Sequence, residues 1–150
     1  MHKSFYASGF LFEPKTQQIL LYQPATKNET PALWSTVGGI SRGKEDALSA
    51  FKRIAQENLK TRLNLKKVYP VYDYFNNKLE KKNYVFYAEV ESLKKIQPLH
   101  GGNFSWFTFK QISKLPFSKE TKNDIIVAER VIKAHAREKA ARLAKSPRCQ

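Results

Sequence analysis

Short apolar runs separated by turn residues characterise the first forty positions. Residues 5–12 form one such run, and residues 19–22 form a second one that stops before Pro24. Each run is long enough for a strand, and the segment between them is typical of a turn, so the two predict a β-hairpin. After a polar loop at 24–33, the segment 34–39 predicts a short strand that leads into a glycine-rich turn.

The spacing of the apolar residues changes from about two to about 3.6 after this turn. Apolar side chains then recur on one side of a segment from about Asp46 to Leu59, at positions 47, 48, 51, 54, 55 and 59. This pattern predicts an amphipathic helix that packs one face on a core.

The second half of the chain predicts aromatic strands followed by helices. Residues 68–74 and 84–90 are aromatic-rich, and Asn76-Asn77-Lys78 between them suits a hairpin turn. The elements expected after them are a strand at 104–107, a short helix starting at 109–112, and a last helix over Asn123 to Ala144 that Ser118 would cap. We expect five apolar side chains of that helix to face the core, namely Ile125, Ile126, Ala128, Val131 and Ile132.

The composition is that of one folded domain. The chain has 150 residues, 41% of them hydrophobic and 13% aromatic, which supplies a packed core and excludes global disorder. No run approaches the roughly 18 apolar residues of a membrane span, and the first residues lack the apolar stretch of a signal peptide, so we expect a cytoplasmic protein. Cys149 is the single cysteine, which excludes an internal disulfide and a cysteine-rich zinc site.

The positive charge is concentrated at the C-terminal end. The formal net charge is +14, and residues 130–150 contribute +6 of it, because seven cationic side chains there face Glu138 alone. Such a segment favours polyanionic partners, including nucleic acid, through salt-dependent contacts. A solvated surface that only maintains solubility explains the same charge, and both interpretations stay open.

One set of spacings carries a family resemblance. Five residues separate Gly39 from Glu45, and seven separate Glu45 from Arg53. Together with the segment 34–39 before them and the late strand 104–107, these positions resemble the Nudix hydrolase family over residues 5–117. The resemblance implies an α/β fold, with a mixed sheet between helices in an α/β/α sandwich. We expect this domain to occupy residues 1–120, and residues 121–150 to form a basic C-terminal helix and tail packed on it or appended to it.

The signature segment, residues 39–60, is here called the Nudix box, and its second half departs from the family pattern. Three carboxylates are expected after the arginine, but only Glu57 remains, and Ile54, Asn58 and Lys60 replace two of the acids and the closing glycine. At about 100° per residue, positions 54, 57 and 58 share one flank of the helix. Ile54 offers this flank no oxygen, and Asn58 offers only a neutral carbonyl.

The resemblance implies roles for the residues that remain. Mg²⁺ or Mn²⁺ would be held by Glu45 and Glu57, since Mg²⁺ prefers hard oxygen ligands. Arg53 would orient the acids and act with Glu57 in catalysis. Glu89 or Glu91 would supply a missing ligand, unless both are solvated carboxylates of an edge strand. Phosphate would contact a loop of Gly38, Gly39, Arg42 and Lys44. A base would stack on an aromatic side chain, for which Tyr22 and Trp34 are the candidates.

Two functions are compatible with this box. One is a metal-dependent hydrolase of a nucleoside diphosphate linked to another moiety, weakened by the lost carboxylates. The other is a catalytically silent Nudix domain that binds a nucleotide-type small molecule or nucleic acid. Segment 92–119 contains no acid, and its one base-like group, His100, belongs to a residue type that is more often structural. Family membership favours the hydrolase slightly, and the sequence specifies neither the substrate nor the oligomeric state.

Overall fold

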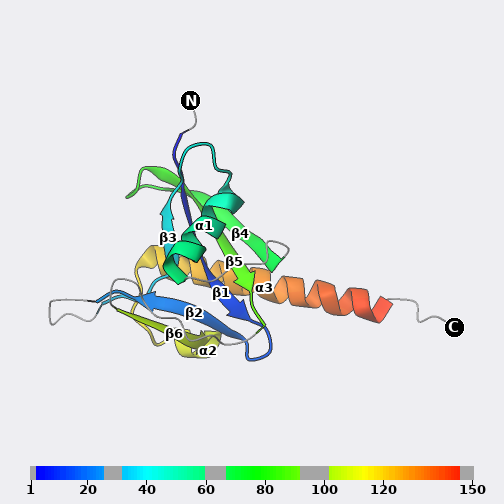
Figure 1. Ribbon diagram of the computed structural model, residues 1–150. Coiled ribbons are helices and arrows are strands. Elements are labelled where there is room, and N and C mark those ends of the chain that lie inside the picture. Colours follow the sequence, from blue (N-terminus) through cyan, green and yellow to red (C-terminus); the bar gives the residue numbers. More distant parts are fainter. Residues whose placement is uncertain (1–2, 26–31, 60–66, 92–101, 146–150) are drawn as a thin grey trace.

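A computed structural model describes residues 3–25, 32–59, 67–91 and 102–145. Within these ranges the chain forms one mixed sheet of six strands with helices on both faces (Figure 1). The elements in chain order are β1 (Tyr6–Glu13), β2 (Gln18–Gln23), β3 (Val37–Ile40), α1 (Ala47–Leu59), β4 (Val68–Asn76), β5 (Lys81–Glu89), β6 (Asn103–Thr108), α2 (Phe109–Ile112) and α3 (Lys119–Lys145). None of the described helices is long and apolar enough to cross a membrane.

Strand β1 is the centre of the sheet. It pairs in parallel with β5 on one side, and on the other side it pairs antiparallel with β3 near its start and with β2 near its end. The strand order is β4-β5-β1-β2-β6, with β3 attached to β1 outside this sequence. The predicted hairpins β1–β2 and β4–β5 are therefore both present.

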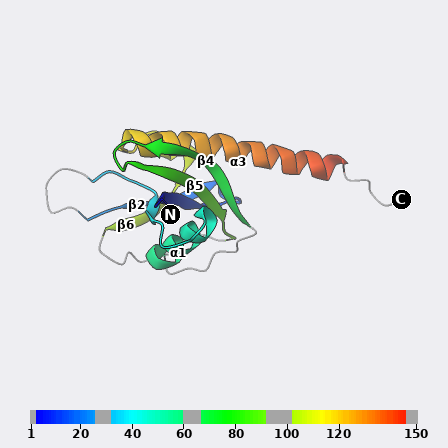
Figure 2. The same ribbon diagram turned by 90° about the horizontal axis from the view of Figure 1, so that it is seen from above.

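The two faces of the sheet carry two separate hydrophobic layers. Because side chains alternate along a strand, Ala7 and Leu11 of β1 face α1, whereas Phe10 and Phe12 face α3. Figure 2 shows α1 and α3 on opposite sides of the sheet. This arrangement confirms the predicted α/β/α sandwich.

The glycine pair belongs to a strand and not to the loop that the family resemblance implies. Gly38 and Gly39 lie inside β3, paired with Ser8 and Ala7, and the turn that leads into α1 comes only after Ile40. The reason is close packing: a Cβ at Gly38 would lie 2.6 Å from the Tyr6 hydroxyl oxygen, and a Cβ at Gly39 would lie 3.2 Å from Ile54. The absence of side chains at these glycines therefore leaves room for the side chains of Tyr6 and Ile54.

The last helix differs from its prediction in two ways. It begins at Lys119, directly after Ser118, whose Oγ accepts a hydrogen bond from the Thr121 amide at 3.2 Å and caps the helix. Ile125 is buried, but Ile126 is 42% exposed, so its predicted inward orientation is wrong. From 136 to 144 every side chain is exposed, and this half of α3 extends beyond the sheet (Figures 1 and 2).

The neighbouring isoleucines of α3 give a matched test of how the helix packs. Replacing Ile125 with alanine should lower the free energy of unfolding by about 2–5 kcal/mol, because it opens a cavity in the layer beneath α3. Replacing Ile126 with alanine should cost less than about 1 kcal/mol. Urea unfolding of both variants measures the difference, and equal losses would contradict the packing described. The domain boundary near residue 120 stays a prediction. A single cooperative unfolding transition would argue that the residues before and after this boundary do not fold as two independent units.

Candidate functional site in the Nudix box

The turn before α1 positions the first acid of the box. Gly43 has a φ of 55°, a left-handed conformation that glycine adopts without strain. This turn brings the Arg42 amide to within 2.7 Å of Glu45 Oε1. Asp46 then caps the helix by accepting a hydrogen bond from the Ser49 amide at 2.8 Å. The turn thereby places the side chain of Glu45 beside the first turns of α1.

Arg53 holds Glu45 with two hydrogen bonds. Its Nε lies 2.8 Å from Glu45 Oε2, and its Nη2 lies 3.0 Å from Glu45 Oε1. The same Nη2 donates to the Ile40 carbonyl at 2.9 Å, which links α1 to the end of β3. These bonds, with the Arg42 amide as the second contributor, lower the pKa of the Glu45 carboxyl. Glu45 therefore stays ionised to a lower pH than an ordinary glutamate.

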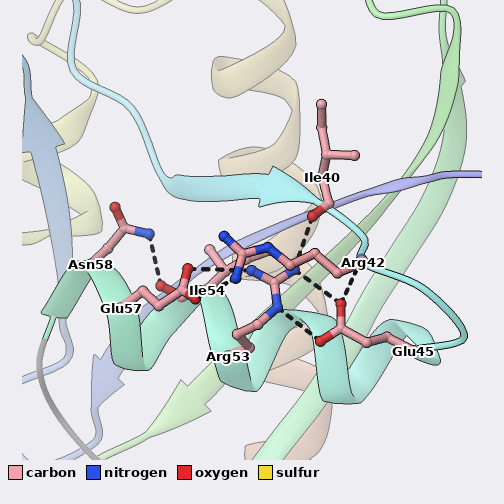
Figure 3. A network of polar contacts seen from close by, with 7 residues as sticks. All are labelled: Ile40, Arg42, Glu45, Arg53, Ile54, Glu57 and Asn58. Atoms are coloured by element: carbon pink, nitrogen blue, oxygen red, sulfur yellow. Dashed lines mark hydrogen bonds and ion pairs between the residues drawn. The ribbon is translucent and has the colours of Figure 1, made fainter.

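Glu57 is engaged by two arginines. Arg42 Nη1 donates to Glu57 Oε1 at 3.0 Å, and Arg53 Nη1 donates to Glu57 Oε2 at 3.3 Å (Figure 3). As a result, all four carboxylate oxygens of Glu45 and Glu57 accept a hydrogen bond from an arginine residue. Two acids and two bases form an ion-pair cluster without net charge.

The two replaced positions of the flank have different surroundings. Ile54 is 2% exposed and belongs to the hydrophobic layer between α1 and the sheet. Asn58 donates its Nδ2 hydrogen to the Ile54 carbonyl at 2.7 Å, so its amide is tied to the preceding helical turn. Position 54 therefore stabilises packing, and Asn58 borders the open side of the helix.

This donor set does not fit a divalent cation. A cation would have to displace guanidinium groups from both glutamates, and Ile54 offers it no ligand. In the parts of the chain that the structure describes, no three histidine, cysteine or acidic side chains gather where they could hold a metal. Glu89 ends β5 opposite Phe12, and Glu91 pairs with Lys67 at 3.6 Å, so neither joins Glu57 in such a group. His100 and Lys60 lie outside the described residues.

A cavity of about 190 Å³ opens beside the end of this helix. Tyr22 and Phe104 form an aromatic wall, with ring centroids 4.9 Å apart, and Asn58 and Gly38 lie on other sides. The second stacking candidate does not reach it. Trp34 packs edge-on against Phe107, at 4.9 Å between ring centroids, in the layer under α3.

A second cavity of about 320 Å³ adjoins the first and was not predicted. Both cavities are lined by Tyr6, Ser35 and Thr36. Asp124 of α3, 4% exposed, lies in the wall of the second cavity. The sequence gives little indication of this position. An aspartate one residue before the inward-facing Ile125 is compatible with a buried site residue and equally with a solvated charge in the first turns of a helix.

Of the remaining loop residues, Gly38 and Gly39 fill strand positions, and Lys44 is exposed beside Arg42. Arg42 is the cation of this loop that turns towards α1, and its side chain remains 68% exposed. The structure therefore joins Arg42, Glu45, Arg53 and Glu57 in one cluster, and Tyr22 with Gly38 in the adjacent cavity.

Comparisons with known proteins agree with this architecture. The chain matches the NUDIX domain family over residues 4–129. No curated protein matches it. Among solved structures, the chain is similar to a binary complex of a C. elegans Ap4A hydrolase, with a TM-score of 0.67 and 15% identity over 86% of this chain and 98% of that one.

Two further structures show how varied proteins with this fold are. The NUDIX domain of Shewanella oneidensis NrtR, complexed with ADP ribose, has a TM-score of 0.68 and 14% identity over 88% of this chain and 90% of that one. The C-terminal domain of mouse MUTYH, in complex with human PCNA, has a TM-score of 0.60 and 13% identity over 85% and 88%. At such identities the structures establish the fold alone. Because the family match covers most of the sequence, this chain belongs to the Nudix family.

Proposed function

We propose that this protein is a Nudix domain that binds a nucleoside diphosphate-type ligand without a divalent metal and hydrolyses it slowly or not at all. One observation carries the proposal: every carboxylate oxygen of Glu45 and Glu57 accepts a hydrogen bond from Arg42 or Arg53. Nudix hydrolases generally use divalent metals. In this box, the two acids that would bind such a metal are already neutralised by arginines.

The chemistry of diphosphate hydrolysis explains why this matters. Water must attack phosphorus while charge develops on the phosphate oxygens, and metal ions supply both charge neutralisation and an acidified water. In this chain Ile54 is buried in the core, and Asn58 carries no charge. The described residues thus support anion binding better than they support water activation.

Three features support nucleotide binding. The aromatic wall of Tyr22 and Phe104 offers a stacking surface to a base. Arg42 offers an exposed guanidinium whose partner, Glu57, precedes the cavity residue Asn58 on α1. An exposed guanidinium can exchange its contact with Glu57 for a phosphate at little cost, since exposed ion pairs contribute little stability. The net charge of +14 also attracts anions over a longer range.

Binding and turnover measurements separate this proposal from a metal-dependent hydrolase, which the family favours. Calorimetry should show that ADP binds in EDTA, and that Mg²⁺ does not strengthen this binding. Tyr22→Ala should weaken binding about tenfold or more, because it removes a stacking surface. Ile126→Ala serves as a control distant from the cavity. Cleavage of ADP-ribose to AMP and ribose phosphate at ordinary enzyme rates, about 1–1000 per second, would refute the silent domain.

Restoring the lost acids should create metal affinity. In the double variant Ile54→Glu, Asn58→Glu, calorimetry should detect Mg²⁺ binding that the unmodified protein lacks. Formation of AMP from ADP-ribose should increase as well. The melting temperature without metal should fall, because a charge replaces a buried side chain and the acids repel one another. Mg²⁺ should restore part of this loss.

The matched control is Ser49→Glu, Gln56→Glu, which adds the same charge on the opposite side of α1. It should gain no Mg²⁺ affinity. Mg²⁺ binding by the unmodified protein, or equal binding by both double variants, would contradict the importance of the flank.

The exposed half of α3 favours nucleic acid as a second partner. Arg137, Lys139 and Arg142 stand on a stretch of helix with no buried side chain, and Glu138 is the one acid among them. Changing these three residues to glutamine should weaken binding to duplex DNA. It should also reduce the slope of log K against log salt by up to about 3, as expected for lost phosphate contacts.

The control variant changes Lys15, Lys110 and Lys114, three exposed lysines of the body, to glutamine and alters the net charge equally. Fluorescence anisotropy over a range of salt concentrations measures both. If the two variants lose affinity equally, the helix acts through net charge alone.

A further inference from the structure

A third cavity, here called the α2–α3 pocket, lies between α2, the segment that follows it and the first turns of α3. Its volume is about 200 Å³, and it shares no lining residue with the two cavities of the candidate site. Six of the nine described residues that line it are apolar, so it suits an apolar side chain. The lining comprises Phe109, Ile112, Ser113, Leu115, Phe117, Lys122, Ile125, Ile126 and Glu129.

The pocket lies where the hydrophobic layer beneath α3 reaches the surface. Ile112 and Ile125 are buried in this layer, and half-buried aromatic and aliphatic side chains pack against it. Ile126 stands at the edge of the pocket with 42% of its surface exposed. An apolar side chain that enters the pocket would remove this surface from water, which favours its binding.

Hydrogen bonds hold the wall of the pocket in place. At the start of α2 the Gln111 amide donates to Thr108 Oγ1 at 3.2 Å, and the Thr108 amide donates to Gln111 Oε1 at 2.9 Å. Beyond α2 the Trp34 amide donates to the Pro116 carbonyl at 3.0 Å. The wall is therefore formed before a partner arrives, which lowers the entropy cost of binding.

The edge of the pocket carries positive charge. Lys122 belongs to the lining, and Lys110 and Lys114 are each next to a lining residue in the sequence. All three lysines are exposed, and within the part of the chain that the structure describes none of them forms an ion pair. The acid in the lining, Glu129, is paired with Lys133 at 2.8 Å. The charge of the lysines is therefore available to an acidic partner.

We propose that the α2–α3 pocket is a docking site for an acidic peptide segment of a partner protein. A large apolar side chain of the segment fills the pocket against Ile126, and its carboxylates lie beside Lys122. Apolar anchors in pockets contribute much of the binding free energy at protein interfaces, while complementary charge increases the association rate and the specificity. This inference is independent of the proposed nucleotide site.

The charges argue against two other occupants. Each chain carries a net charge of +14, so two copies repel one another, and a second copy would bring its own unpaired lysines. A nucleic acid is attracted to the lysines through its phosphates, but phosphates leave the apolar lining of the pocket exposed. An acidic segment with an apolar side chain satisfies both the lysines and the lining.

Fluorescence anisotropy with labelled synthetic peptides tests this proposal. The probes have about twelve residues, are rich in glutamate, and carry leucine or phenylalanine at positions i and i+4, with alanine at these positions in a matched set. At least one probe should bind, and its alanine counterpart should bind about tenfold or more weakly. Ile126→Glu should weaken binding to a similar extent, because it places a negative charge at the edge of the pocket. Lys122→Glu should also reduce the dependence of binding on salt.

The matched controls are Leu143→Glu and Lys139→Glu, which make the same substitutions at exposed positions of α3 beyond the sheet. Both should retain the affinity for the peptide, and melting temperatures will show whether each variant folds. Equal losses in the control variants, equal binding of the alanine peptides, or no binding by any peptide would overturn the proposal. A dimer in sedimentation experiments that Ile126→Glu dissociates would assign the pocket to a second copy, and would overturn it as well.

Discussion

The pairing of β1 on both edges is the constraint on which the molecule depends. Because the strand is hydrogen-bonded to β5 on one side and to β2 and β3 on the other, its alternating side chains are committed to opposite layers. Ala7 and Leu11 hold α1 against one face, while Tyr6 and Ser8 line the cavity on the other. A shift of one residue in this register would exchange the core and the cavity.

The same strand explains how the ion-pair cluster and the cavities come to be neighbours. Gly38 and Gly39 pair with Ser8 and Ala7, so the strand that ends at the Nudix box also forms the side of the first cavity. Arg53 then ties α1 to the Ile40 carbonyl at the end of β3. The box therefore keeps its geometry through ion pairs and backbone contacts, even though two family carboxylates have been replaced.

The sequence predicted those features that local patterns determine. Alternating and helical spacings identified both hairpins and α1, because residues near in sequence decide these elements. The family resemblance implies a phosphate-binding loop at Gly38 and Gly39, whereas in the structure distant side chains, Tyr6 and Ile54, require the missing Cβ atoms. Ile126 was placed inward because it is apolar, although its neighbour Ile125 occupies the buried side of α3.

The site was predictable only where a motif spans few residues. Glu45, Arg53 and Glu57 lie within one turn and one helix, so their proximity follows from spacing alone. The second cavity joins Ser8, Asn83 and Asp124, which are far apart along the chain, and no local pattern connects them.

The distribution of charge separates two kinds of anion recognition. Inside the Nudix box, two arginines are balanced by two glutamates, so a phosphate there must compete with existing ion pairs. On the distal half of α3, Arg137, Lys139 and Arg142 face Glu138 alone, and they are exposed along a helix that the body does not cover. Charge alone therefore contributes less to binding at the balanced cluster than the fit of the ligand does. The unbalanced helix favours a partner with many regularly spaced phosphates, for which charge alone is sufficient.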